Sequence, residues 1–335
     1  MYFDAHTHLN NNELYPDRKK HLKAFITAWW IWLVNIWVNQ SYNTRWIEIM
    51  KEFYHIDKVH STQLTKSAKY SHIQYNNTKQ SPNEKGIGVW CTIGLHPYEV
   101  VSGDIVESNV HTKIKEMCAL YAPHKELIVA IGECGIDTHY PESEHTLDTQ
   151  KDLFRQQCDL ARQWWLPIVI HSRSNWKATH EILQNFKDLT IYFHCRSYTP
   201  DEIKIIKATY PNFYIGFCGN ISYPKASEIR KSLRFLVHEN ENYPDHIMSW
   251  KVEEMRHPAF YSRLREEGSG AESKDLMKLS NILIETDAPY LAPQSHRGET
   301  NTPALIVETY SYISSLLGMD ITSQVGENAK RCYRL

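Results

Sequence analysis

Short apolar runs recur along the chain, separated by segments with helical spacing. Several runs are rich in Ile and Val and show little alternation, as expected of parallel strands covered on both faces. Eight runs are predicted to form strands: Tyr2–His8, Trp32–Val38, Gly88–Leu95, Leu127–Glu133, Leu166–His171, Thr190–His194, Phe213–Phe217 and Asn281–Glu285.

Helical patterns lie between most of these runs. The clearest covers Gln150–Trp165, and Pro200 opens another that runs to about Tyr210. Alternating strands and helices predict a closed (β/α)₈ barrel of the TIM type. An open doubly wound sheet is the alternative, but the chain has no G-x-G-x-x-G phosphate loop to support one.

Two polar stretches interrupt the alternation, at about 55–85 and 237–275. Neither has the apolar content of a separate domain. We therefore predict one domain over residues 1–335 with two loop insertions.

Composition and charge narrow the class of protein. The chain has 335 residues, with 42% hydrophobic and 23% charged residues, which indicates a folded globular protein. The net charge of -2 provides no broad positive field, so a nucleic acid would have to be held locally. Seven cysteines without a C-x-x-C pair predict a reduced cytoplasmic protein. The most apolar window, Phe25–Val38, is too short to span a membrane.

Histidines and carboxylates stand where the predicted strands end. His6 and His8 are two positions apart on a strand, so both side chains point to one face. An H-x-H pair, a carboxylate after a strand and a lone histidine are each common without a metal. Together they form a set of four histidines and two carboxylates: His6, His8, Glu133, His171, His194 and Asp287.

This set is typical of a two-metal hydrolase. Ligation by nitrogen and oxygen alone suits Zn²⁺, Mn²⁺ or Mg²⁺. Two such ions can share one hydroxide, lower its pKa and clamp an attacked phosphoryl group. A carboxylate can bridge the ions, and Asp287 is the candidate to orient or deprotonate the attacking water. Both carboxylates are thus candidate catalytic residues.

Six ordered segments resemble the successive motifs of TatD-type metal-dependent deoxyribonucleases. The similarity covers essentially the whole chain apart from the two polar insertions. The segments are Phe3–His8, Ile93–Pro97, Gly132–Asp137, Pro167–Arg173, Phe193–Cys195 and Ile284–Pro293, and both Arg297–Pro303 and Asn328–Arg331 also match.

The resemblance implies a TIM-like barrel of the amidohydrolase superfamily that hydrolyses phosphodiester bonds in DNA. It implies one metal on His6, His8 and Asp287. It implies a second on His171 and His194, with Glu133 as the bridge. Three further residues are expected around the substrate: His96 and Arg173 facing the phosphate, and Asp137 supporting the site.

Other functions remain open at this stage. The same metals could hydrolyse a different ester, an amide or a lactone, or the chain could be a metal-binding scaffold without catalysis. The small net charge favours attack at a DNA strand end. We expect a monomer with DNA as substrate, no membrane and no obligatory protein partner.

The tryptophans form an anomaly. The chain has 10 tryptophans and only 13 glycines, whereas average usage near 7% would give roughly 23 glycines. Trp165 follows a predicted helix where a left-handed cap favours glycine, and Trp30 and Trp37 crowd the second strand. One hypothesis is that UGA codons decoded as glycine have been read as tryptophan. The alternative is an unusual aromatic core.

Overall fold

Eight parallel strands lie side by side in sequence order. The computed structural model describes residues 2–29, 32–36, 45–46, 48–50, 88–195, 198–237 and 279–335. The strands are β1 Phe3–Thr7, β2 Trp32–Asn35, β3 Gly88–Ile93, β4 Ile128–Asp137, β5 Ile168–Arg173, β6 Ile191–Phe193, β7 Phe213–Phe217 and β8 Ile282–Ile284.

The ring closes between its first and last strands. The Asp287 N–H donates to the His6 carbonyl at 2.9 Å, and the His8 N–H donates to the Ala288 carbonyl at 2.8 Å. These bonds continue the ladder just beyond β8. The predicted (β/α)₈ barrel is therefore confirmed.

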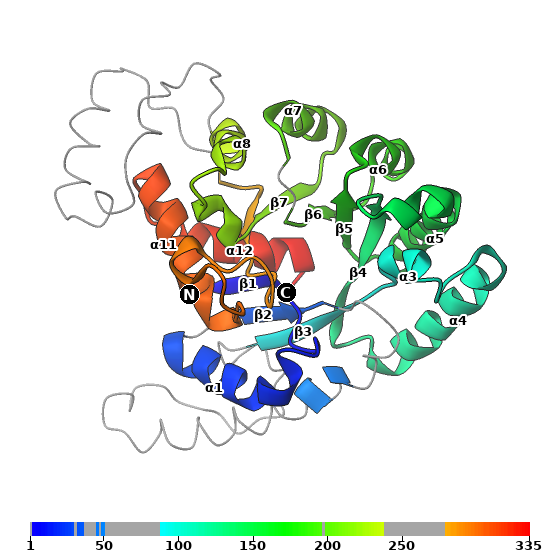
Figure 1. Ribbon diagram of the computed structural model, residues 1–335, viewed down its shortest axis with the longest axis horizontal. Coiled ribbons are helices and arrows are strands. Elements are labelled where there is room, and N and C mark those ends of the chain that lie inside the picture. The colour runs from blue at the N-terminus through cyan, green and yellow to red at the C-terminus, as the bar shows by residue number, and fades with distance from the viewer. Residues whose placement is uncertain are drawn as a thin grey trace.

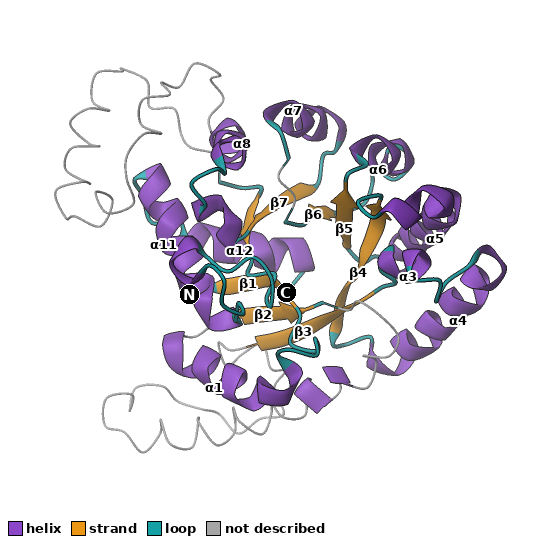
Figure 2. Cartoon of the chain, viewed as in Figure 1, coloured by secondary structure: helices purple, strands orange, loops and turns teal. Residues whose placement is uncertain are grey.

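Helices surround the ring of strands (Figures 1 and 2). Each long helix turns an apolar stripe towards the strands. The helices are α1 Arg18–Trp29, α3 Tyr98–Val101, α4 Val110–Tyr121, α5 Leu147–Trp164, α6 Trp176–Leu183, α7 Pro200–Thr209, α8 Ser227–Val237, α11 Ile306–Leu317 and α12 Thr322–Tyr333. The predicted helices over Gln150–Trp165 and from Pro200 correspond to α5 and α7.

The core has two layers. The larger layer fills the space between strands and helices, with Phe154 of α5 and Ile170 of β5 among its buried members. The smaller layer lies inside the ring, where Phe3 stacks with Trp90 at 6.4 Å and with Tyr333 at 6.3 Å between ring centroids. Tyr333 comes from α12 and donates to the Ala5 carbonyl at 2.7 Å. This aromatic filling makes the ring a packed core.

Two strands continue past the residues at which they were expected to end. β4 was predicted to stop at Glu133 and β5 at His171, but they run to Asp137 and Arg173. The β4–β5 register shifts between Ile131 and Cys134, and Gly132 and Gly135 adopt positive φ angles of 136° and 146°. Such a bulge lets a strand continue past a polar side chain that faces the site.

The two predicted insertions lie outside the described residues, apart from Val237, which ends α8. The end of the second predicted strand, Trp37–Val38, also lies outside them. Among the described helices, none is both long and apolar enough to cross a membrane.

Candidate metal centre

β1 supplies the first two imidazoles. His6 and His8 are both buried, at 0% and 3% exposure, and their Nε2 atoms lie 3.2 Å apart. The Nδ1 atom of His8 lies 3.4 Å from the Ile36 carbonyl. A proton on Nδ1 directed at this carbonyl leaves the His8 Nε2 lone pair facing the centre, as is usual for metal-binding histidines.

Glu133 occupies the middle of the site. Its Oε2 atom lies 3.5 Å from His6 Nε2 and 3.9 Å from His8 Nε2. Its Oε1 atom lies 2.7 Å from His171 Nδ1 and 3.0 Å from His194 Nε2. Each carboxylate oxygen therefore faces one of the two histidine pairs, as a bridging carboxylate would.

Glu133 is ionised in these surroundings. Burial alone would raise its pKa, but the charge of His194 and the hydrogen bonds with His171 and His194 outweigh burial. They hold the pKa of Glu133 well below its ordinary value.

Asp287 joins the His6 and His8 half from the opposite end of the chain. Its Oδ1 atom lies 3.2 Å from His8 Nε2 and 3.7 Å from His6 Nε2. Burial opposes its ionisation, but the hydrogen bond with His8 and the imidazoles of His194 and His6 lower the pKa of Asp287. The six residues predicted as ligands thus converge at one mouth of the barrel.

Asp137 sits behind the centre and makes no contact with the surface. It is 2% exposed, and its Oδ2 atom lies 3.0 Å from His171 Nε2. We grouped Asp137 with the substrate contacts from the sequence. The geometry favours a different task, which is to hold the His171 ring so that Nδ1 faces Glu133.

His96 also approaches Glu133, with its Nε2 atom 3.7 Å from Oε1. The Tyr98 N–H donates to His96 Nδ1 at 3.0 Å. Burial and the neighbouring His171 lower the pKa of His96 to about 3, so the ring is neutral. A neutral ring that accepts at Nδ1 carries its proton on Nε2. His96 therefore presents a donor to the centre and no lone pair for a metal.

Arg173 ends β5 at the rim and is exposed. Its guanidinium carbon lies 5.7 Å from the centre of the Tyr140 ring. Among the described residues, no carboxylate pairs with it. This cation is available to an anionic ligand at the mouth.

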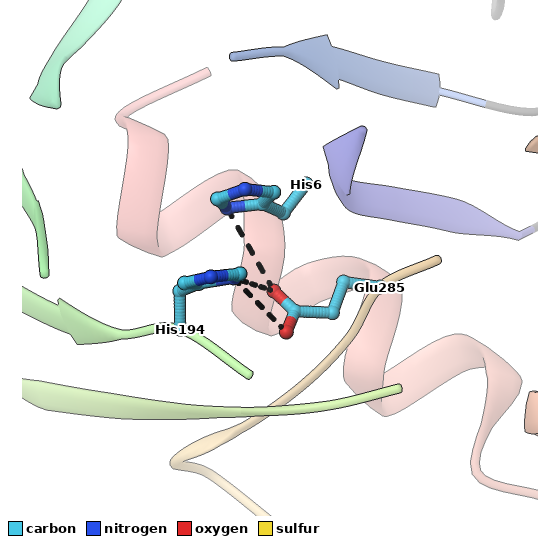
Figure 3. Close-up of side chains that lie close together, drawn as sticks. All are labelled: His6, His194 and Glu285. Atoms are coloured by element: carbon cyan, nitrogen blue, oxygen red, sulfur yellow. Dashed lines mark hydrogen bonds and ion pairs between the residues drawn. The ribbon is translucent and has the colours of Figure 1, made fainter. Parts of the chain in front are cut away.

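Two buried carboxylates near the site, Asp4 and Glu285, were not among the residues predicted from the sequence. Asp4 accepts from the Thr286 N–H at 2.9 Å and from the Thr286 hydroxyl at 2.6 Å, which ties β1 to the segment after β8. Glu285 lies against His6 and His194 (Figure 3). Their positions two residues before His6 and Asp287 were the available signal, since alternate strand residues share a face.

The cysteines differ from expectation at one place. The structure pairs Cys195 with Cys218, a pairing that the sequence did not predict. The two cysteines follow β6 and β7, which are neighbours, and their Cα atoms lie 6.0 Å apart. A separation of 23 residues hides this proximity in the sequence.

Comparison with known proteins decides the family. A family model described as "TatD related DNase" matches residues 3–240 and 262–334. The chain belongs to the TatD family. Among curated TatD-like relatives, the chain is similar to an uncharacterized metal-dependent hydrolase, YabD, of Bacillus subtilis. The two are 27% identical over 255 residues, covering 74% of this chain and 78% of YabD.

Other relatives extend the match to the full length. An uncharacterized metal-dependent hydrolase of Mycoplasma pneumoniae is 25% identical over 339 residues, covering 99% of both chains. Two solved structures share the fold at 16% identity. The TatD homologue YJJV of Escherichia coli has a TM-score of 0.66 and covers 100% of this chain and 98% of its own. A TatD family hydrolase of Entamoeba histolytica has a TM-score of 0.67, with 99% and 97% covered.

The donor set of this TatD protein fits divalent metals. Its inward-facing atoms are imidazole nitrogens and carboxylate oxygens, which suit Zn²⁺, Mn²⁺ and Mg²⁺. Donor groups within reach of a single ion include His6, His8 and Glu133. Buried carboxylates gathered this closely require compensating positive charge. Glu133 lies between the two histidine pairs, within reach of both.

Proposed function

We propose that this metal-dependent hydrolase of the TatD family cleaves phosphodiester bonds of DNA, starting from strand ends. The observation that carries the proposal is the combination of a carboxylate-rich centre with a donor and a cation at its edge. His96 presents an N–H towards the centre, and exposed Arg173 ends β5 two residues after His171. A neutral amide or lactone substrate would have no use for Arg173.

Each residue has a separate task in this reaction. Divalent cations held by the centre would lower the pKa of water and offset the negative charge of the attacked phosphoryl group. Asp287 is ionised and directed inwards, so it can orient the attacking water and accept its proton. His96 Nε2 donates to a phosphoryl oxygen. Arg173 pairs with the same phosphate or the next one, because guanidinium and phosphate geometries match.

Exposed aromatic rings at the mouth favour a nucleic acid over a small phosphoester. Tyr98, after β3, is 45% exposed, and Tyr290, after β8, is 52% exposed. The Tyr290 ring lies 6.2 Å from the His8 ring between centroids. Exposed tyrosines are stacking platforms for unpaired bases, which suits a single strand or a frayed end.

The decisive experiment uses end-labelled DNA. Purified protein is incubated with single-stranded, duplex and closed circular DNA in Mg²⁺, Mn²⁺ or Zn²⁺, with EDTA as the control. We expect shortening from the ends of single strands, little action on closed circles and no cleavage in EDTA. Hydrolysis of an aryl ester or a lactone in the absence of DNA cleavage would replace the proposal with another amidohydrolase reaction.

A further inference from the structure

The His6 and His194 imidazoles lie face to face between two carboxylates. Their centroids are 3.7 Å apart and their planes differ by 13°. Both Nε2 atoms face Glu133, at 3.5 Å for His6 and 3.0 Å for His194. Both Nδ1 atoms face Glu285 on the other side (Figure 3), at 4.0 Å for His6 and 3.3 Å for His194.

Glu285 is fixed in this position by the barrel itself. The carboxylate is fully buried, and its Oε1 atom accepts from the Cys195 N–H at 2.7 Å. The Tyr192 hydroxyl donates to its Oε2 atom. Space for this pair exists because residue 216 is glycine, where a Cβ atom would lie 2.8 Å from both Glu285 Oε2 and the Tyr192 hydroxyl oxygen.

The His6 Nδ1 atom lacks a hydrogen-bond partner that Glu285 could supply. This Nδ1 atom is buried and has no hydrogen-bond partner among the described residues. A buried imidazole N–H without an acceptor is costly. The nearby Oε2 atom of Glu285 needs only a small approach to accept that proton.

We propose that Glu285 is a positioning residue shared by the two halves of the centre, accepting the Nδ1–H of both His6 and His194. It thereby keeps each proton on Nδ1 and leaves each Nε2 lone pair for a metal ion. The two rings belong to different halves, so one carboxylate orients a ligand of each ion. This inference rests on the paired-cation part of the proposed function and is independent of the substrate.

The contacts favour this role over direct metal binding by Glu285. A third ion between Glu285 and the Nδ1 atoms would require both imidazoles to bind metal through both nitrogens, and so to lose their last proton. The Glu285 oxygens already accept from Cys195 and Tyr192. A carboxylate behind a metal-binding histidine is also a recurring arrangement in metal sites.

The first test uses the unaltered protein, selectively labelled with ¹⁵N-histidine and loaded with Zn²⁺. We expect the ¹⁵N shifts of His6 and His194 to report metal on Nε2 and a proton on Nδ1, with both Nδ1–H protons slow to exchange and shifted downfield. Metal on Nδ1 of either ring, or a proton lost from both nitrogens, would overturn the proposal.

The second test compares Glu285→Gln with Tyr310→Phe. The Tyr310 hydroxyl donates to the Phe3 carbonyl at 3.0 Å and accepts from the Phe3 N–H at 3.3 Å, so Tyr310→Phe removes two buried hydrogen bonds that do not involve the imidazoles. Zn²⁺ affinity is measured by chelator competition without substrate, and folding by circular dichroism. Glu285→Gln should lower the affinity for both Zn²⁺ ions by about 10–100-fold. Tyr310→Phe should leave the Zn²⁺ affinity unchanged and lower only the midpoint of thermal unfolding.

The outcomes separate this proposal from the proposed function. Unchanged affinity in folded Glu285→Gln, weakening of only one ion, or binding of a third ion by the unaltered protein each contradicts a shared positioning role. Absence of DNA cleavage would leave the metal measurements unaffected. If Glu285→Gln does not fold, the ¹⁵N spectra of the unaltered protein decide the question.

Discussion

Asp287 Oδ1 lies 3.2 Å from His8 Nε2, although 279 positions separate the two residues along the chain. The contact exists because β1 and β8 close the ring, through backbone bonds on either side of it. Asp287 also has a positive φ of 54°, which turns its side chain out of the strand direction and into the mouth. Its carboxylate thus lies beside the imidazoles of His6 and His8.

Asp287→Asn should retain the fold but lose most of the activity. Asparagine keeps an oxygen in a similar position, but a neutral amide binds a metal ion more weakly than a carboxylate does and cannot accept the proton of the attacking water. We expect turnover to fall by about 10²–10⁴-fold with little change in KM. Turnover within a few-fold of the unaltered protein, measured with end-labelled DNA, would remove Asp287 from proton transfer.

Glu133→Ala should abolish activity and lower the metal content of the protein. The substitution removes the one carboxylate whose two oxygens face both histidine pairs. Metal content is measured by mass spectrometry of the purified protein, alongside cleavage of labelled DNA. Glu144→Ala is the matched control, because it removes an exposed carboxylate from the segment after β4. Full activity of Glu133→Ala would show that the proposed bridge is wrong.

Arg173→Ala should keep the metals and weaken substrate binding. The Arg173 guanidinium lies over the Tyr140 ring, outside the cluster of histidines and carboxylates, so its loss should remove only the proposed phosphate contact. We expect KM to rise by about 10-fold or more, since a charge-assisted contact contributes about 1.5–3 kcal/mol. Arg155→Ala removes the same charge from α5 and serves as control. Equal KM values for both variants would exclude Arg173 from the substrate site.

Much of the fold, and the convergence of six histidine and carboxylate side chains at one end of the barrel, could be predicted because both depend on local patterns. The H-x-H spacing places His6 and His8 on one face of a strand, and apolar runs mark all eight strands. The residues at which strands end were harder to predict from the sequence. The apolar run before Glu133 stops there, but a bulge with two positive-φ glycines carries β4 on to Asp137.

Side-chain contacts between different strands could not be predicted from the sequence. The Glu285 side chain reaches the His194 ring because β7 brings the end of β6 close to the segment after β8. The pairing of Cys195 with Cys218 depends on the same neighbourhood. Neither follows from spacing along the chain, since the partners are 91 and 23 residues apart.

Trp165→Gly should stabilise the protein. Trp165 caps α5 in the left-handed conformation, with φ 57° and ψ 33°, and is 78% exposed. A left-handed residue other than glycine costs roughly 1–2 kcal/mol, and an exposed ring returns little packing energy. We expect about 1 kcal/mol of added stability in denaturant unfolding. Gly318→Ala at the equivalent cap of α11, where φ is 66°, should destabilise by a similar amount.

The same position tests the codon hypothesis for the tryptophans. The hypothesis extends to Trp46, whose buried indole Nε1 has no hydrogen-bond partner among the described residues. Trp30 and Trp37 lie outside the described residues. Mass spectrometry of the protein from its native source should find glycine at position 165. Tryptophan at position 165 would contradict the codon hypothesis and show that α5 ends in a left-handed tryptophan.

DNA affinity should fall only gently as salt concentration rises. A protein that neutralises Z phosphates loses affinity with a log–log slope near -0.9Z on duplex DNA and about -0.7Z on single strands. The net charge is -2. Among the described residues, Arg173 is the cation proposed to pair with a phosphate outside the metal centre, because the His96 ring is neutral. One neutralised phosphate predicts a slope of roughly -1. A site with so few contacts suits a strand end entering the mouth. A slope near -6, or efficient nicking of closed circular duplex, would require a binding surface beyond this mouth.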